Sequence, residues 1–189
     1  MSEEDSYIML CHFVKGGLLP EAYYDFTMQG RMVDGLVLEH LIRKEMPKVH
    51  EHLSTLDFEV SVATGMWFSQ CFTGCFSEME LVFRVFDLLL SFGNIILFKL
   101  TLHIIAKSES RIIAADSAHK LHHLFARLAK EVTAQDLRDA ASYRLRTTAL
   151  ETLRHQFFGK KKSKLDQEVE RLRRRYKVKT SEALTAGEH

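Results

Sequence analysis

The sequence predicts an all-α fold, and two observations support this prediction. Apolar residues recur at intervals of three and four along most of the chain, and hardly any segment alternates as a strand does. The 189 residues are 46% hydrophobic and 27% charged, with 9 Gly and 2 Pro. This composition is typical of a globular protein with a sizeable core, and it excludes collagen, a mostly disordered chain and a disulfide-stapled miniprotein.

The first sixty residues contain turn-forming Gly and Pro residues that separate short apolar segments. Gly16 and Gly17 end the first segment, and Pro20 and Pro47 suit the first turn of a helix, where their missing N–H is not needed. The predicted helices are 6–15, a short one beginning at Pro20, 33–44 and 47–53.

The middle of the chain contains its most apolar segments. One helix is predicted over 60–72, centred on Trp67. Ser77, followed three residues later by Glu80, is a capping-box pattern that opens a helix over 81–92, and Gly93 closes it. The next helix, 95–105, is apolar on nearly all sides, as is 81–92, so we expect this pair at the centre of the core.

After about residue 107 the apolar residues form one-sided stripes, which indicates surface helices. One stripe contains Leu121, Leu124, Phe125, Leu128 and Val132. Another, with Leu150, Leu153 and Phe157, is predicted in a single helix that begins at Thr133 or Ala134. The predicted organisation is a main part over 5–107, a helical extension over 108–158 and a basic helical tail over 159–189.

The charge is distributed unevenly. Residues 1–153 hold 15 basic and 20 acidic residues, whereas residues 154–189 hold 11 and 5, although the whole chain has a net charge of only +1. The tail is expected to reach anionic surfaces through charge, or else to be a solvated helix. Tyr176 is the one aromatic residue among its basic residues, so nucleic acid is a disfavoured partner. The candidate contacts are Lys160, Lys161, Lys162, Lys164, Arg173, Arg174 and Arg175.

Cysteine usage and hydropathy indicate where the protein resides. Three cysteines, with no signal peptide ahead of them, predict a reducing compartment and a cytoplasmic protein. The apolar stretch 81–105 is interrupted by charges, and its longest uncharged piece, 88–98, is far shorter than the ~20 residues that cross a bilayer. No transmembrane helix is therefore predicted.

Searches for catalytic and cofactor motifs find no phosphate-binding glycine loop, nucleophile elbow, H-E-x-x-H or C-x-x-C, and no cofactor is predicted. His119, His122 and His123 resemble a metal cluster, but the apolar stripe of their helix turns His119 and His123 toward water, which favours solvated surface histidines. Cys71 and Cys75, one turn apart on the Trp67 side, are interpreted as small buried hydrophobes.

Five residues stand out as structural. Trp67, Phe68 and Phe72 lie within two turns and are expected to form the hub where helices cross. Arg84 and Asp87 are three residues apart on an otherwise apolar helix, so a mutual or interhelical ion pair within the core is expected. We assign all five a structural role.

An ordered series of these residues resembles the C-terminal half of a TBC domain, the domain of Rab GTPase-activating proteins. The match runs over about residues 7–105 and depends most on a W-F-x-x-x-F helix and an R-x-x-D helix at the right separation. Phe86 stands where the family has tryptophan. The matching residues are Leu19-Pro20, Leu36-Val37-Leu38, Leu41, Met46-Pro47, His52-Leu53, Met66-Trp67-Phe68, Phe72, Arg84 to Asp87, Gly93, Ile96 to Lys99 and Leu102.

The resemblance implies GTPase activation by an arginine in I-x-x-D-x-x-R and a glutamine in Y-x-Q, both in the first half of the domain. Neither motif occurs here; the nearest, Ile113-x-x-Asp116-x-x-His119, has histidine in the arginine's place. We expect the chain to begin after that half, and we assign no catalytic residue. The resemblance implies a protein that binds or regulates a Rab-family small GTPase in membrane traffic, peripheral on endomembranes, without catalysis. The alternative is a non-catalytic helical adaptor whose basic tail contacts anionic membrane or a protein partner.

Overall fold

The computed structural model describes residues 2–15, 18–20, 23–76 and 78–159, and throughout these residues it is helical, with no strand. The all-α prediction is therefore confirmed. The helices are α1 (Glu3–Lys15), α2 (Gln29–Glu45), α3 (Pro47–Thr55), α4 (Val60–Ala63), α5 (Gly65–Ser69), α6 (Met79–Phe92), α7 (Ile95–Lys107), α8 (Glu109–Ile113), α9 (Ala118–Leu128), the 3-10 turn η1 (Ala129–Glu131), α10 (Ala134–Ala141) and a last helix over residues 147–159.

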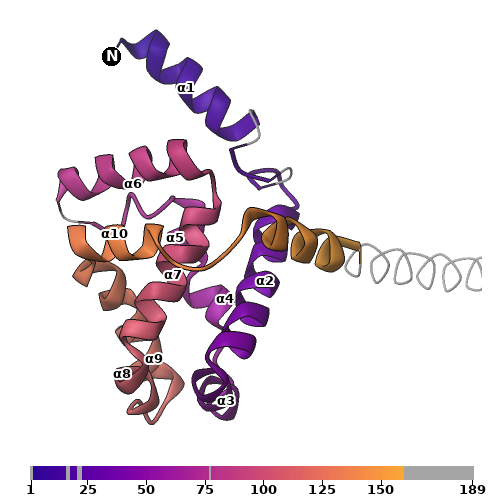
Figure 1. Ribbon diagram of the computed structural model, residues 1–189, viewed down its shortest axis with the longest axis vertical. Helices are drawn as coiled ribbons and strands as arrows, with labels where there is room; N and C mark the ends of the chain where they lie inside the picture. The colour runs from indigo at the N-terminus through magenta and orange to yellow at the C-terminus, as the bar shows by residue number, and fades with distance from the viewer. Residues whose placement is uncertain (1, 16–17, 21–22, 77, 160–189) are drawn as a thin grey trace, which may run out of the picture.

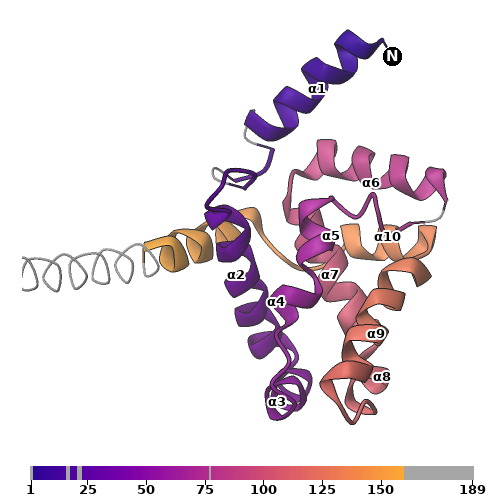
Figure 2. The same cartoon turned by 180° about the vertical axis from the view of Figure 1, so that it is seen from behind.

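Helix α7 is the centre of the fold. It contacts α6, α8 and α10, and nine of its residues are buried, so that little of its surface faces solvent. In Figure 1, α2 and α3 lie on one side of it, α8 and α9 lie on the other, and α6 and α10 cross above them. Helix α1 stands apart from the rest in both views (Figures 1 and 2). The expectation that 95–105 is central is thus confirmed.

Helix α6 is at the surface, contrary to the prediction that it shares the centre of the core. Only Leu81, Val85 and Leu89 are buried, one per turn along a single face. The opposite face exposes large apolar side chains, of which Phe83 is 62% exposed. The helix begins at Met79 with Glu78 as its N-cap, whereas Ser77 lies outside the described residues. Gly93 ends it with φ of 74°, as expected for a residue free of a Cβ.

The segment 60–72 was predicted as one helix, and this prediction is wrong. The segment forms α4 and α5 and then a turn in which Cys71 and Phe72 have φ of 48° and 63°. The left-handed turn brings Phe72 back over Trp67, with ring centroids 5.5 Å apart, and its N–H donates to the Trp67 carbonyl. Burial of Phe72 offsets the strain of a positive φ at a non-glycine residue.

The short helix predicted at Pro20 is absent from the described residues between α1 and α2. The Asp25 carboxylate accepts hydrogen bonds from the backbone N–H groups of Thr27 and Met28, which forms a local turn instead. Residues 16–17 and 21–22 lie outside the described part of the chain.

The single helix predicted after Thr133 is two helices. Thr133 and Asp136 form a capping box that opens α10, as the sequence led us to expect at its start. The Lys99 Nζ then donates to the Ala141 carbonyl at 3.0 Å and satisfies the end of α10. The break at residues 142–146 redirects the chain so that 147–159 packs beside α2 (Figure 1).

Candidate functional site

Six aromatic rings from three helices, a loop and a turn gather around Trp67. The Trp67 ring stacks with that of Phe125 in α9, with ring centroids 5.9 Å apart, and the centroids of the Phe125 and Phe58 rings are 5.2 Å apart. Next to Trp67, Phe68 meets Phe98 of α7 edge-on at 4.9 Å. Trp67, Phe68 and Phe72 are all buried, each at most 4% exposed. The three residues that the sequence singles out thus lie where α5, α7 and α9 cross.

Arg84 and Asp87 lie at the surface, contrary to the expectation of a charged pair within the core. The Arg84 Nη2 donates to Glu80 Oε1 at 2.7 Å, one turn back along α6, and both side chains are substantially exposed. Asp87 is exposed as well. The exposure of Arg84 places it outside the core. An exposed i,i+4 ion pair of this kind contributes only about 0.3–0.5 kcal/mol to the stability of the helix.

A buried ion pair occurs where the sequence predicted none. Arg154, in helix 147–159, donates through Nε and Nη2 to the two carboxylate oxygens of Asp34 in α2, at 2.7 and 2.9 Å. Its Nη1 donates to Asn94 at the start of α7 and to Glu151, each at 2.8 Å. The guanidinium also lies over the Phe98 ring, 5.4 Å from its centroid. One side chain therefore binds α2, α7 and its own helix together.

The protonation of this cluster follows from burial and pairing. Burial alone lowers the pKa of the Arg154 guanidinium, but the hydrogen bonds that it donates to the Asp34 carboxylate outweigh burial and leave the pKa raised. Burial raises the pKa of Asp34, and the two bonds from Arg154 oppose that change. Bidentate guanidinium–carboxylate geometry satisfies both charges, so the pair can be held in the interior.

Asp34 is the residue of this cluster that a sequence signal could have found. It lies on the face of α2 that carries Val37, Leu38 and Leu41, and a lone carboxylate among apolar residues requires a partner. The partner is 120 residues away, and periodicity carries no information on such pairing.

A second polar cluster joins α7 to α10. Asp136 accepts a hydrogen bond from Lys107 Nζ at 2.7 Å and lies 3.0 Å from His103 Nε2, while Thr133 also donates to it. Burial raises the pKa of Asp136, but the bonds from Lys107, Thr133 and His103 outweigh it and leave the pKa well below its usual range. The carboxylate is therefore charged at neutral pH.

An apolar slot of about 490 Å³ separates α1 from the turn after α5 and from α6. The Phe13 ring of α1 meets Phe86 of α6 edge-on at 5.4 Å and closes one part of the slot. Met9, Leu10 and Val14 contribute to its wall. Both helices also expose large apolar side chains, and exposed apolar area is typical of a protein interaction site. These exposed residues are Tyr7, Ile8, Leu10, Val14, Met79, Phe83, Leu90 and Phe92.

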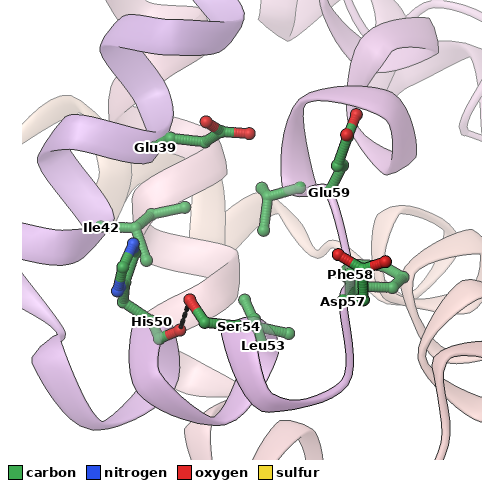
Figure 3. Close-up of a pocket in the computed structure, with 9 residues that line it drawn as sticks. Glu39, Ile42, His50, Leu53, Ser54, Asp57, Phe58 and Glu59 are labelled. Carbon is green, nitrogen blue, oxygen red and sulfur yellow. Dashed lines mark hydrogen bonds between the residues drawn. The ribbon is translucent and has the colours of Figure 1, made fainter.

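A smaller pocket of about 240 Å³ lies between α2, α3 and the start of α4 (Figure 3). Its floor is apolar, whereas Glu39, Asp57 and Glu59 place carboxylates around it. The Ser54 hydroxyl donates to the His50 carbonyl at 2.8 Å within α3, so neither group is directed at a ligand. Carboxylates around an apolar floor suit a basic side chain of a partner.

The histidines and cysteines give no sign of catalysis. Within the described residues, no group of three or more His, Cys, Asp or Glu side chains is placed to hold a metal ion. His119, His122 and His123 are exposed, as predicted. Cys71 is buried and Cys75 partly so, both as free thiols; burial raises the pKa of both thiols, that of Cys75 to about 11. These thiols are therefore poorly reactive.

The other predicted site residues are placed as follows. Ile113, Asp116 and His119 fall at the end of α8 and the start of α9, and the Asp116 carboxylate is paired with Lys120 at 2.6 Å. The seven basic residues of the tail, from Lys160 to Arg175, lie outside the described residues. No helix in the described part of the chain is both long and apolar enough to cross a membrane.

Comparison with known proteins decides the family. The model of the Rab-GTPase-TBC domain matches residues 1–113, more than half of the chain. The chain belongs to the Rab-GTPase-TBC domain family. The resemblance seen in the sequence is thereby confirmed, and the match covers part of the TBC domain.

Curated relatives agree with this assignment. The bovine (Bos taurus) protein named small G protein signaling modulator 3 is 28% identical over 145 residues, 77% of this chain and 19% of the relative. A fission yeast (Schizosaccharomyces pombe) TBC domain-containing protein is 27% identical over 64% of this chain and 15% of its own length. Mouse (Mus musculus) TBC1 domain family member 30 is 28% identical over 64% of this chain. The chain spans less than a fifth of these relatives.

Proposed function

We propose that this TBC chain binds a Rab-family small GTPase and that, by itself, it does not accelerate GTP hydrolysis. One observation supports both parts: the chain belongs to the Rab-GTPase-TBC domain family, yet its sequence contains neither I-x-x-D-x-x-R nor Y-x-Q. An arginine supplied to the transition state is worth about 10³–10⁵ in rate. A chain without that arginine keeps a scaffold for binding and lacks the group that stabilises the transferring phosphate.

The exposed apolar residues of α1 and α6 support a protein partner. Leu10 and Val14 of α1, with Phe86 of α6, line a slot that contains no charged side chain, so the surface is suited to burial against another protein. Membrane traffic is the setting we propose, with the protein in the cytoplasm and in peripheral contact with endomembranes.

A pull-down of the full chain against a panel of Rab proteins, each loaded with GDP or a non-hydrolysable GTP analogue, tests the binding. We expect at least one Rab to be retained. A single-turnover assay on each retained Rab tests the second part, and the expected hydrolysis rate is that of the Rab alone. Retention of none of the panel would contradict the binding; a several-fold faster hydrolysis would contradict the lack of activation.

A pair of variants tests whether α6 takes part in binding. Phe83 is 62% exposed on α6, and Val62 is 63% exposed on α4, on a different part of the molecule. We expect Phe83→Gln to weaken Rab retention about ten-fold, as removal of a buried aromatic anchor does, and Val62→Gln to leave it unchanged. Equal retention by both variants would exclude the exposed face of α6.

We also propose that residues 108–158 are an extension that completes the fold of the family segment 5–107, and that 159–189 is a separate basic tail. Arg154, Lys99 and Tyr143 support the first part, since each bridges the two segments: Arg154 to Asp34, Lys99 to the Ala141 carbonyl and Tyr143 to Glu45.

The basic tail favours a second function, that of an adaptor at an anionic surface. Residues 154–189 hold 11 basic against 5 acidic residues, and each basic residue near an acidic membrane is worth about 1 kcal/mol. We expect the full chain to float with phosphatidylserine vesicles at low salt, and a variant with Gln at Lys160, Lys161, Lys162 and Lys164 to float less.

The matched control for that experiment removes four charges outside the tail, by changing to Gln the exposed lysines Lys44, Lys48, Lys120 and Lys130. Vesicles of neutral phosphatidylcholine complete the comparison. Unchanged flotation of the tail variant, or equal loss in the control, would reject the tail as a membrane contact.

A further inference from the structure

Two histidines on the solvent-exposed face of α9 have their rings turned toward one another. His119 and His123 are one turn apart, both exposed, with Nε2 atoms 3.1 Å apart. Their rings are nearly perpendicular at 85°, with centroids 4.5 Å apart. Each ring presents the same nitrogen to the space between them, and this space is open to solvent.

The spacing of these nitrogens suits a shared metal ion. With metal–nitrogen distances of about 2.0–2.1 Å, two imidazole ligands are about 2.9 Å apart at a right angle and about 3.4 Å apart at the tetrahedral angle. The 3.1 Å separation of His119 and His123 falls between these limits. An ion can therefore be bound by both rings with small side-chain rotations and no movement of the helix.

The neighbouring groups limit the site to two protein ligands. His122 is turned away, with its ring 4.7 Å from the Phe58 ring. The Asp116 carboxylate is paired with Lys120. The described residues contain no group of three metal-ligating side chains, so water would complete the coordination. Neutral imidazole donors favour copper, nickel and zinc over magnesium and calcium.

We propose that His119 and His123 form a binding site for one divalent transition-metal ion of the copper, nickel or zinc class. The ion binds the Nε2 lone pair of each neutral ring; the ring that donates its Nε2–H in the metal-free pair gives up that proton to solvent and takes one up at Nδ1, so that both rings carry their proton on Nδ1 and no net proton is released. Because the ion binds both turns of the helix at once, it stabilises α9 in its folded form and has less affinity for the unfolded chain.

Titration calorimetry of the full chain with CuCl2, NiCl2 and ZnCl2, with MgCl2 as the control ion, tests the proposal. We expect one ion per chain at the site, tightest for copper as ligand-field preference dictates, and an unfolding temperature that rises with copper and not with magnesium.

Single variants locate the site. His119→Ala and His123→Ala are each expected to weaken copper binding about ten-fold or more, because either change removes one of two ligands. The double variant should bind copper no more tightly than either single variant. His122→Ala, next to the pair and equally exposed, should change the affinity less than about two-fold.

These outcomes separate the proposal from binding elsewhere, since the chain contains 10 histidines. Equal losses in all three single variants, or no loss in the His119 and His123 variants, would overturn the site. Because all three side chains are at the surface, circular dichroism should show the same helicity in each variant, and the affinity change therefore reports the ligands.

Discussion

Helices α6 and α7 follow one another in the chain and are both rich in Leu, Ile, Val and Phe, but the structure buries them differently. Helix α7 contacts α6, α8 and α10 and is covered on nearly every side. Helix α6 is covered along Leu81, Val85 and Leu89 only. The apolar residues of α7 make the core, whereas those on the outer face of α6, such as Phe83, are exposed.

The difference teaches that apolar content alone does not place a helix in the core. Two further observations set the helices apart: α7 carries polar residues that bind other helices, such as Lys99 and His103, whereas the charged side chain of Arg84 on α6 bonds only within its own helix. Helix α7 supplies interhelical bonds and is surrounded by other helices, whereas α6 pairs Arg84 within the helix and has a face open to solvent. The variants Phe98→Ala in α7 and Phe83→Gln in α6 test this contrast in burial.

The largest effect is expected in the centre of α7. Phe98 is fully buried between Phe68 and Arg154. We expect Phe98→Ala to lower the free energy of unfolding by about 3–5 kcal/mol, as removal of a core aromatic ring does. Urea unfolding at pH 7 measures this. A loss under 1 kcal/mol would contradict the central position of α7.

The next effect concerns the ion pair that joins α2, α7 and the last helix. Arg154→Ala leaves the Asp34 carboxylate buried without its partner, so we expect a loss of about 3 kcal/mol in the free energy of unfolding. The double variant Asp34→Leu, Arg154→Met removes both charges and should recover most of that loss. If the single variant proves as stable as the unmodified chain, the last helix is not held in this way.

A smaller, pH-dependent effect is expected at Asp136. Because its pKa is held below the ordinary value, the ionised carboxylate contributes stability above about pH 4, and this contribution is lost as the pH falls through the folded-state pKa. Lys107→Ala should lower the free energy of unfolding by about 1 kcal/mol at pH 7, since Lys107 is largely exposed.

The free energy of unfolding of the unmodified chain and of Lys107→Ala, measured at several pH values, shows in which direction the contribution of Lys107 changes with pH. The difference in free energy of unfolding should hold its pH 7 value down to about pH 4 and shrink only as the pH falls through the lowered folded-state pKa of Asp136, because the protonated carboxyl no longer attracts the ammonium group. A difference of the same size once Asp136 is protonated in both folded chains would show that Lys107 acts through packing.

The smallest effect is expected on the outer face of α6. Phe83→Gln should change the free energy of unfolding by less than about 0.5 kcal/mol, as surface substitutions do, while it weakens binding to the protein partner. Urea unfolding of Phe83→Gln beside Phe98→Ala compares the two helices directly. A loss as large as that of Phe98→Ala would place the outer face of α6 in the core.

The sequence predicts the class of the fold and the aromatic hub because both depend on local signals. Trp67, Phe68 and Phe72 are close in sequence, and Thr133 with Asp136 is a local cap, so spacing suffices to find them. The turn at Cys71 was missed because a positive φ at two residues other than glycine opposes their intrinsic preference and is imposed by the packing of Phe72.

Contacts between residues far apart in the sequence account for the other differences between the predicted and the observed structure. The break after Ala141 depends on Lys99, 42 residues earlier, and the Asp34–Arg154 pair spans 120 residues. The exposure of α6 could not be predicted either, since periodicity shows that a helix is apolar but not how many neighbours cover it. The slot beside α1 arises from the same cause.

The central proposal is that this chain binds a Rab and does not by itself accelerate GTP hydrolysis. Single-turnover hydrolysis of GTP on a Rab that the chain retains tests this most directly, with saturating amounts of the full chain. The predicted rate equals that of the Rab alone while the complex is intact. A several-fold acceleration would contradict this proposal, provided that the control variant Val62→Gln gives the same acceleration and the variant Phe83→Gln, which is expected to bind less, loses it.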